Sequence, residues 1–461
     1  MAQISSLHVA GMAATLLLIM VIGVNSGKKV KNSSDFSTGG KSASFSLVAG
    51  ALISTLIGGS STIGTAQLAF SYGLTAWWFT LGTGLGCLLF GFFLVKPFRK
   101  SGFDTIQQVI SHEYGSTAGV VASVLSSIGI VLNIVAQILS ANALLTTVFG
   151  ISTAMSAAIT VSIMICYVVF GGVLGTGILG NVKLVLTYVA VGFGTYKILS
   201  LSGGMTPIYN ALPAEKYFSM FARGFGIDFG SLVSVVLGVF CGQTYVQTIL
   251  SGRTDSDAQK ATVAAALLLP PVGLGSVLIG MYMRIQHPLM DSSQAFPLFV
   301  LENMHPLLGG AVLATLLLAL VGTGSGMALG FGTIVSKDLY KKFICRTADG
   351  KRELLVSRTF IVLSFLVSSF IVSMNPDSPI LSWGFLATGL RGTVLLFPML
   401  GALFFKNKVH IGFAVASSIA GVGTHLACGI LLDLNFDPIF PGIAAGFLVF
   451  SAGAFAKRNK A

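Results

Sequence analysis

The segment Leu52–Gly73 reads LISTLIGGSSTIGTAQLAFSYG and interrupts an apolar run that is long enough to cross a bilayer. At its centre lie Gly58-Gly59-Ser60-Ser61, followed by Gly64-Thr65. A lipid-facing helix should not carry this cluster, because backbone groups freed by a break find no water in hydrocarbon. A broken helix is tolerated where it lines a cavity, and it then offers carbonyls and hydroxyls to a solute. The alternative is a small-residue face for close helix packing.

The composition of the chain indicates a polytopic membrane protein. Its 461 residues are 54% hydrophobic and only 9% charged. The net charge is +12, and nearly all lysines and arginines lie in short polar loops, which is the pattern of membrane topology rather than of nucleic-acid binding. The five cysteines form no CxxC pair, and the six histidines have no metal-ligand spacing. No nucleophile–base pair or phosphate loop is present, so we expect neither an enzyme nor a bound cofactor.

Apolar runs of about 20 residues, the length that spans a bilayer, predict about thirteen transmembrane helices. The first run is followed by Lys28, Lys29 and Lys31 and preceded by no cation, which predicts a retained span with the N-terminus outside. Alternation then places the C-terminus in the cytoplasm of a cell-membrane protein. The runs are 8–26, 45–72, 74–96, 117–148, 150–170, 174–200, 228–250, 261–283, 307–336, 355–374, 379–405, 409–432 and 437–456.

A second interruption, Gly238–Tyr245 (GVFCGQTY), lies five predicted spans after the first. Corresponding breaks in two sets of five spans indicate an inverted repeat with a binding site near the bilayer midplane. We therefore predict an all-α fold with a five-plus-five core, one extra N-terminal helix and two extra C-terminal helices. The predicted divisions are 1–44 for the extra helix and a cytoplasmic loop, 45–201 and 202–405 for the repeats, and 406–461 for the last two helices and tail.

Two cations fall near the middle of predicted spans. Lys183 lies about eleven residues after the cytoplasmic turn predicted at Gly171-Gly172, hence roughly 16 Å deep at the rise of an α-helix. Arg391 lies about twelve residues into another run. Such residues cost at least a few kcal/mol and indicate function, unless they bind carbonyls of broken helices or extend to the interface. No carboxylate lies near the middle of a span, so an anionic solute is one candidate partner.

Uncharged polar side chains also recur in the apolar runs. Asn133 and Gln137 are four residues apart, as are Gln243 and Gln247, so each pair shares a helix face. Each residue alone could equally make an interhelical hydrogen bond. Together they predict a polar path whose lining includes Ser60, Ser61, Gln67, Asn133, Gln137, Asn181, Gln243 and Gln247.

The order of several short motifs resembles the bacterial sodium/solute symporter family over nearly the whole chain. This resemblance implies the leucine-transporter fold with an extra N-terminal helix. The motifs are Ser34-Asp35-Phe36 to Gly40-Lys41, Gly64 to Tyr72-Gly73-Leu74, Tyr167–Gly172 (YVVFGG), Gln247–Lys260 (QTILSGRTDSDAQK) and Lys337–Lys341 (KDLYK).

The resemblance also implies a set of sodium ligands. In the family, sodium binds two carbonyls of the broken second span, and a carbonyl and two adjacent hydroxyls of the ninth span. Those positions fall on Ser54 and Ile57, and on Ala319, Gly322 and Thr323. Gly322 has no hydroxyl, and the family's acidic residue of the sixth span falls on Asn181, two residues before Lys183. In related folds without sodium dependence, a lysine ammonium can take the sodium position, and Lys183 is the candidate here.

We therefore predict a secondary active transporter that couples sodium to the uptake of a small organic solute by alternating access. The unpaired cations favour a carboxylate, and Arg391 joins the polar residues as a candidate substrate contact. One alternative is a transporter of the same fold driven by protons or exchange, with Lys183 in place of sodium. A channel or a solute sensor is an alternative of another class. The expected partners are the solute, Na⁺ or H⁺ and the bilayer, with no nucleic acid and a monomer as the functional unit.

Overall fold

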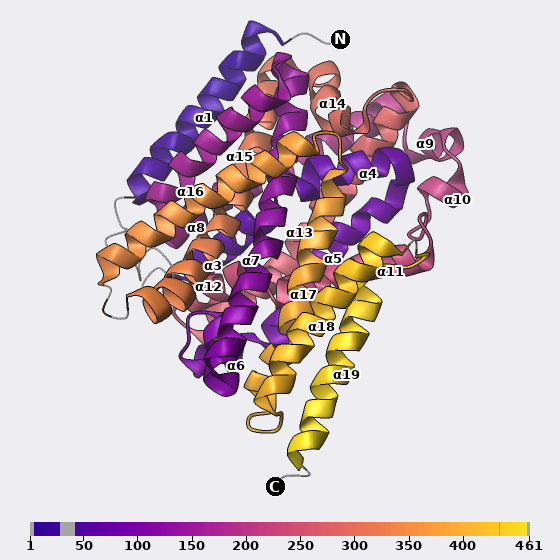
Figure 1. Cartoon of the computed structure of the whole chain (residues 1–461). Coiled ribbons are helices and arrows are strands. Elements are labelled where there is room, and N and C mark those ends of the chain that lie inside the picture. The colour runs from indigo at the N-terminus through magenta and orange to yellow at the C-terminus, as the bar shows by residue number, and fades with distance from the viewer. Residues whose placement is uncertain (1–3, 28–41, 346, 348, 433, 459–461) are drawn as a thin grey trace.

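Helices make up nearly all of the computed structural model, which describes residues 4–27, 42–345, 347, 349–432 and 434–458 (Figure 1). The predicted loop at Lys28–Lys41, with the first of the family motifs, lies outside the described residues. The helices are α1 (Ser6–Gly27), α3 (Phe45–Leu56), α4 (Thr65–Tyr72), α5 (Trp78–Phe93), α6 (Val95–Ser101), α7 (Ile106–Phe149), α8 (Thr153–Ser202), α9 (Met205–Ala211), α10 (Ala214–Tyr217), α11 (Phe225–Phe240), α12 (Gln243–Ser251), α13 (Asp255–Gln286), α14 (Ala295–Asn303), α15 (Pro306–Thr333), α16 (Gly350–Met374), α17 (Ile380–Phe404), α18 (Ile411–Leu431) and α19 (Ile439–Arg458). Two segments are π-helical, η2 (Ser60–Gly64) and η5 (Ile334–Ile344), and two are 3₁₀ turns, η3 (Gly73–Trp77) and η4 (Ser292–Gln294).

The described residues form a multi-pass bundle. Nine helical segments are long and apolar enough to cross a membrane, and a tenth results if the bent pair α11 and α12 is one span. Three shorter apolar helices accompany them, at Ser6–Ile19, Phe45–Leu56 and Thr153–Val168. The all-α membrane fold is thus confirmed, whereas the total of thirteen spans stays a prediction.

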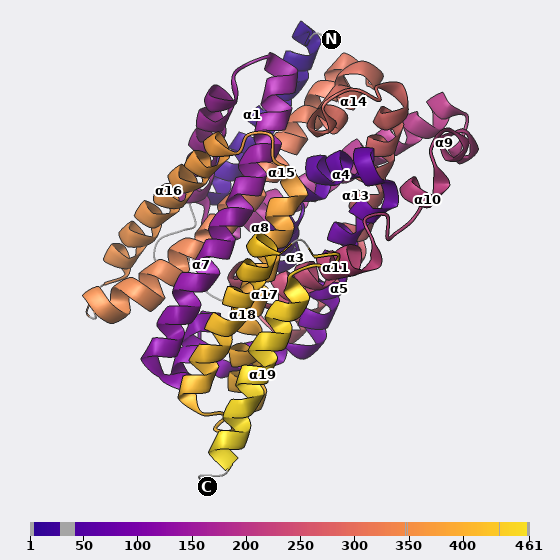
Figure 2. The same cartoon turned by 45° about the vertical axis from the view of Figure 1, so that its right-hand side comes forward.

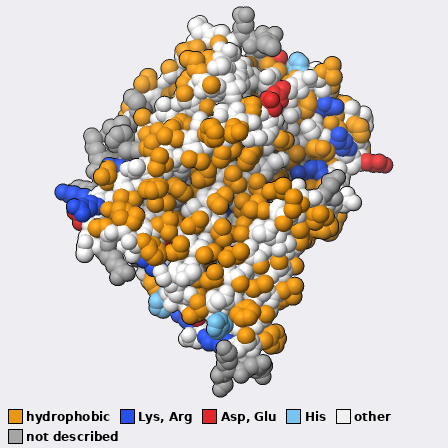
Figure 3. Space-filling view, viewed as in Figure 1, with side chains coloured by type: hydrophobic (Ala, Val, Ile, Leu, Met, Phe, Trp, Pro, Cys, Tyr) orange, Lys and Arg blue, Asp and Glu red, His pale blue; other side chains and the backbone are white. Residues whose placement is uncertain are grey.

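The two ends of the chain lie at opposite ends of the bundle (Figures 1 and 2). Hydrophobic side chains cover most of the visible side of the molecule, and charged side chains lie near its margins (Figure 3). This distribution is what a bilayer around the middle of the bundle requires, because charges are costly in hydrocarbon. Opposite ends also agree with an odd number of spans. Which end faces the cytoplasm stays a prediction.

The central helices are distinguished from the peripheral ones by burial. In the apolar window of Pro306–Ile344, 83% of residues are buried, and in Ile380–Phe404 the share is 72%. The share falls to 33% in α18 and 22% in Ile439–Lys457, so these last two helices flank the bundle. The core therefore lies around α15 and α17.

Helix α8 differs from the two separate spans predicted for its residues. The chain is helical from Thr153 to Ser202, without a break at the expected turn of Gly171-Gly172. Nevertheless, Met164 and Lys183 both lie against the same part of α15, beside Gly324 and Gly322. A straight helix would separate them by about 28 Å. The arms 153–168 and 180–202 therefore lie beside one another against α15.

Helix α7 begins well before the predicted span 117–148, because a bent segment precedes it. The Thr105 side chain caps its first turn by accepting a hydrogen bond from the Gln108 amide. Gly115 then takes φ 81° and ψ 174°, a conformation open to glycine but strained for other residues. The bend folds residues 106–114 back along the helix, and Gln107 Nε2 donates to Ser126 Oγ at 2.9 Å.

Candidate solute and ion site

The Gly58-Gly59 cluster forms a true break. Helix α3 ends at Leu56, and Ile57 has extended backbone angles, φ −84° and ψ 102°. The freed amide of Gly59 donates to Gln137 Oε1 at 2.8 Å. A Cβ on Gly59 would lie 2.3 Å from Ser140, so only glycine lets α7 approach this closely. The break thus has local hydrogen bonds that replace those of a continuous helix.

The second break follows α11. This helix ends at Phe240 and α12 starts at Gln243, with a bend of 44° between them. A Cβ on Gly238 would lie 2.4 Å from Thr388 Cβ, which brings α11 against α17 just before the bend. Both interruptions singled out in the sequence are therefore bends of the backbone and not continuous packing helices.

The ammonium of Lys183 lies between the first break and α15. Its Nζ donates to Ser54 O at 2.6 Å and to Ala319 O at 2.8 Å, and lies 3.4 Å from Thr323 Oγ1. The Thr323 hydroxyl is also 3.0 Å from Ile57 O. An ammonium has three N–H donors, so these three oxygens match its capacity. We call this group the Lys183 cage: Lys183, Ser54, Ile57, Ala319 and Thr323.

The Lys183 cage contains the oxygens that the family resemblance assigns to sodium. The fifth member of that ligand set, Gly322, contributes no side-chain oxygen, and a Cβ there would lie 3.3 Å from Lys183 Nζ. Sodium prefers a shell of oxygen ligands, as other hard cations do. In this conformation the ammonium already binds two of the carbonyls. The structure therefore brings the predicted ligands together, but around an internal cation.

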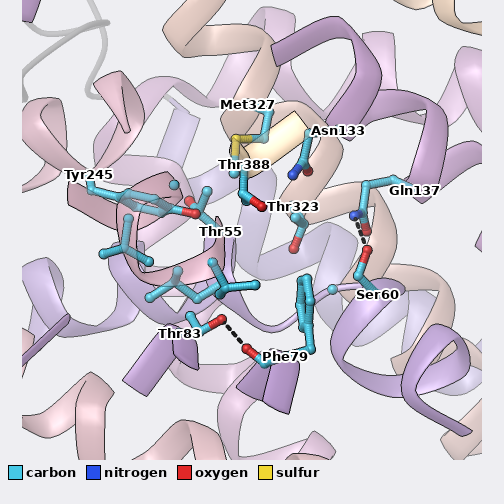
Figure 4. A pocket seen from close by; sticks show the side chains of 15 residues that line it. Thr55, Ser60, Phe79, Thr83, Asn133, Gln137, Tyr245, Thr323, Met327 and Thr388 are labelled. Carbon is cyan, nitrogen blue, oxygen red and sulfur yellow. Dashed lines mark hydrogen bonds between the residues drawn. The ribbon is translucent and has the colours of Figure 1, made fainter. Parts of the chain in front are cut away.

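A small cavity of about 30 Å³ lies beside the Lys183 cage (Figure 4). That volume suits about one water molecule. Tyr245 approaches from one side, and Ser60 and Gln137 lie on the opposite side. The lining residues are Thr55, Leu56, Gly58, Ser60, Phe79, Thr83, Asn133, Gln137, Val235, Gly238, Val239, Tyr245, Thr323, Met327 and Thr388.

Three of the predicted substrate residues line this cavity: Ser60, Asn133 and Gln137. Gln137 connects α7 to the first break. Its Nε2 lies 3.3 Å from Ser60 Oγ, and its Oε1 accepts a hydrogen bond from the Gly59 amide. Asn133 is 5% exposed, and its Oδ1 has no hydrogen-bond partner within the described part of the chain. A buried amide oxygen without a donor costs free energy, so it is suited to accept from a solute or a water.

The other uncharged candidates lie outside the cavity lining, and most hold helices together. Gln67 accepts a hydrogen bond from the Ile380 amide at 2.9 Å. Gln243 accepts from the Ile106 amide at 3.0 Å, and Gln247 donates to Thr333 at 2.6 Å. Ser61 donates back to Gly58 O at 2.9 Å within the first break. Asn181 donates to Ser46 O at 3.1 Å, away from the Lys183 cage.

Arg391 lies behind the cavity wall rather than in it. It is 1% exposed, and Gly129 leaves the space for its side chain. Nε donates to Ala387 O at 3.3 Å, and Nη1 lies 3.8 Å from Met327 Sδ. Tyr245 is nearby, but Nη2 has no partner of bonding geometry in the described residues. Met327 and Tyr245 thus separate the guanidinium from the cavity.

Sequence reasoning did not single out Thr55, Phe79, Thr83, Tyr245, Met327 or Thr388 as lining residues. Helical spacing from residues already singled out could have identified two of these lining residues. Met327 lies one turn after Thr323, and Thr388 lies one turn before Arg391. Tyr245 ends the second interruption itself. Phe79 and Thr83 had no such signal, because they come from α5, which contains no break.

Comparison with known proteins supports the class of protein that the broken helices and their cavity define. Residues 36–421 match the model of the Sodium:solute symporter family. The match covers most of the chain, which therefore belongs to this family and is a solute symporter of the membrane rather than an enzyme.

Similar proteins share low identity over nearly the full length. The osmoregulated proline transporter OpuE of Bacillus subtilis is 22% identical, over 94% of this chain and 92% of that protein. The monocarboxylic acid transporter of Corynebacterium glutamicum is 23% identical, over 92% of this chain and 83% of that protein. The substrate-bound outward-open structure of a Na⁺-coupled sialic acid symporter has a TM-score of 0.83 at 17% identity, covering 98% of both chains. This last likeness establishes the leucine-transporter type of fold.

Proposed function

We propose that this protein is a secondary active transporter in which the Lys183 ammonium takes the place of the coupling sodium ion. The solute binds beside the two broken helices and crosses by alternating access, as the repeats 45–201 and 202–405 move against each other. The N-terminus lies outside the cell, and one chain is the functional unit. The observation that carries this proposal is the pair of short bonds from Lys183 Nζ to Ser54 O and Ala319 O.

The cage argues against simultaneous sodium binding. A sodium ion bound to the same oxygens would lie about 4 Å from the ammonium, where two unit charges repel by about 4 kcal/mol at an effective dielectric constant near 20. This exceeds the free energy of a typical hydrogen bond to a charged group. Proton release from the amine, or exchange of one solute for another, would then couple transport.

Sodium coupling is the second candidate, because family membership favours it. It requires the Lys183 side chain to leave the cage in another conformation. The test is solute uptake into proteoliposomes with and without sodium, at several imposed pH gradients. Full uptake without sodium supports the ammonium proposal, and an absolute sodium requirement contradicts it. Flux that does not saturate with solute concentration would instead favour a channel.

The solute is proposed to be a small carboxylate, with Arg391 as the partner of its charge. Arg391 is buried, has spare N–H donors and lies behind the movable side chains of Met327 and Tyr245. Several similar proteins are named for solutes with a carboxylate group: proline, monocarboxylic acids and sialic acid. One relative is named for choline, which has no carboxylate.

The cavity must enlarge for any such solute, so the carboxylate would reach the guanidinium only when these side chains move. A thermal-shift screen of carboxylates, amino acids and neutral sugars tests the solute class. Stabilisation by neutral sugars alone would contradict the assignment to carboxylates.

A further inference from the structure

A second and larger cavity lies apart from the solute site, at the end that the charge pattern assigns to the cytoplasm. Its volume is about 430 Å³, within the range of small-molecule sites. It opens between the folded-back start of α7 and the π-helix η5 (Ile334–Ile344). Its lining includes Lys337, Lys341 and Lys342 on η5, together with Asp338 and Gln107. We call this the η5 cavity.

The π-helical winding of η5 is what gathers the lysines. Its hydrogen bonds join residues five apart, so residues four and five apart share one face. Lys337, Lys341 and Lys342 therefore lie together, whereas an α-helix would turn Lys342 away from the other two. π-Helical turns are rare and are frequent at functional sites.

The lysines offer donors at the rim of the η5 cavity. Lys337 Nζ donates to Asp104 at 2.5 Å, Lys342 Nζ donates to Ser111 Oγ at 2.6 Å, and Lys341 donates to Glu353. The Lys341 side chain is still 46% exposed. Since the Lys341 ammonium has three N–H donors and its side chain is exposed, it keeps capacity for an anionic group at the rim, beside the charge of Lys342.

The deep wall of the cavity has the opposite character, because it presents acceptors. Gln107 is 1% exposed, and its Oε1 has no hydrogen-bond partner in the part of the chain described. Asp338 is 7% exposed; its Oδ1 accepts from Thr105 at 3.0 Å, whereas no described residue donates to its Oδ2. Two buried acceptors without donors are costly, and hydroxyl groups of a ligand would satisfy them.

We propose that the η5 cavity binds a phosphate ester that carries hydroxyl groups, with the phosphate at Lys341 and Lys342 and the hydroxyls at Gln107 and Asp338. The ligand can be a lipid headgroup or a soluble phosphate ester of the same chemistry. Two exposed hydrophobic side chains next to the rim favour a lipid as the ligand. Phe343 is 57% exposed and Ile344 is 76% exposed, so both would contact acyl chains. Basic pockets at the cytoplasmic side of membrane proteins bind anionic headgroups in this way.

The test is thermal unfolding of the purified full chain in a neutral detergent, with four added probes. Short-chain phosphatidylglycerol should raise the unfolding midpoint. Phosphatidic acid, which lacks the glycerol hydroxyls, and phosphatidylcholine, which lacks net charge, should raise it much less. Glycerol phosphate identifies the source: an equal shift at equal concentration assigns the site to soluble phosphate esters, and a shift with the lipid alone assigns it to the headgroup.

Variants locate the binding. Lys342→Ala should weaken the apparent affinity for phosphatidylglycerol about fivefold, and Lys342→Arg should retain most of it. Lys406→Ala is the control, since Lys406 is exposed and does not line the cavity. If Lys342→Ala does not fold, Lys341→Ala tests the same charge. Three outcomes would overturn the proposal. They are equal shifts with phosphatidic acid and phosphatidylglycerol, no shift with either phosphatidylglycerol or glycerol phosphate, and unchanged affinity in the lysine variants. None of these outcomes depends on solute transport.

Discussion

Lys183 and Arg391, the two fully buried cations among the described residues, have equal burial and unequal surroundings. Lys183 and Arg391 are each 1% exposed, and neither forms a salt bridge with a described carboxylate. Lys183 directs its donors at two carbonyls and lies near one hydroxyl, whereas Arg391 has one carbonyl, a thioether sulfur and an Nη2 without a partner. The same desolvation is therefore offset by more oxygen contacts at Lys183 than at Arg391. In the proposed function, the second cation keeps donors for a ligand.

The largest expected effect is that of Lys183→Met, which keeps the volume of the side chain and removes its donors. Uptake should fall at least about 100-fold, a loss of about 3 kcal/mol in transition-state stabilisation. Because Ser54 O and Ala319 O lose a charged donor, the free energy of unfolding should also fall, by about 1–3 kcal/mol. Proteoliposome uptake and thermal unfolding measure the two effects. Lys197→Met, in the same helix but outside the cage, is the control. Equal losses of uptake and stability in both variants would contradict the proposed role of Lys183.

A gain of sodium dependence is the next expected effect and bears directly on the nature of the cage. The double variant Lys183→Ala and Gly322→Ser removes the ammonium and supplies the missing hydroxyl, on a Cβ that would lie 3.2 Å from Ser54 Oγ. Sodium should then restore uptake roughly tenfold above the Lys183→Ala level, because the oxygen shell becomes complete. Lys183→Ala alone, without the added hydroxyl, is the control. If sodium has no effect on the double variant, the cage is not a converted sodium site.

Arg391→Met should separate transport from stability. Uptake of a carboxylate should fall about tenfold to 100-fold, while the free energy of unfolding should change little or rise, since a buried charge without an ion partner is removed. This outcome is the reverse of that for Lys183→Met. Arg391→Lys should recover only part of the uptake, because lysine lacks the planar fork of guanidinium. A fall in stability as large as that of Lys183→Met would show that Arg391, too, is a structural cation.

The smallest effect concerns a partly buried carboxyl outside the spans. Asp437 lies before α19, and burial raises the pKa of its carboxyl, although the Ile439 amide and Arg223 act against this rise. The native state thus binds the proton more tightly than the unfolded state. Its contribution to stability is present at low pH and is lost as pH rises from about 3.9, the ordinary value for Asp, through the raised pKa of the folded state. Asp437→Asn should flatten this decline in the unfolding midpoint; the same slope in both proteins would contradict it.

Much of the fold could be predicted because hydrophobic runs leave few options in a bilayer. The broken helix at Gly58-Gly59 and the bend near Gly238–Tyr245 followed from glycine-rich interruptions in those runs. The predicted turn between spans 150–170 and 174–200 depended on Gly171-Gly172. The chain is helical there, although the arms 153–168 and 180–202 lie beside one another. Glycine tolerates a turn but does not impose one, so the pair gave a weak signal.

The candidate site was predicted less completely than the fold. Ser60, Asn133 and Gln137 line the cavity, whereas Gln67, Gln243 and Gln247 hold helix ends or neighbouring helices together. A buried glutamine in an apolar run indicates only that a hydrogen-bond partner exists nearby. Whether that partner is a backbone amide or a solute depends on the neighbouring helix, which sequence spacing does not reveal.

The sequence by itself determined that two cations lie at membrane depth and that a broken helix accompanies them, because hydropathy and helical rise set depth along each span. Only the tertiary structure decided which cation meets oxygen. The carbonyls that bind Lys183 lie 129 and 136 residues away along the chain, and the sulfur beside Arg391 lies 64 residues away. Such pairings result from packing between distant helices, where shifts of an ångström select the partner, and a local pattern contains no information at that range.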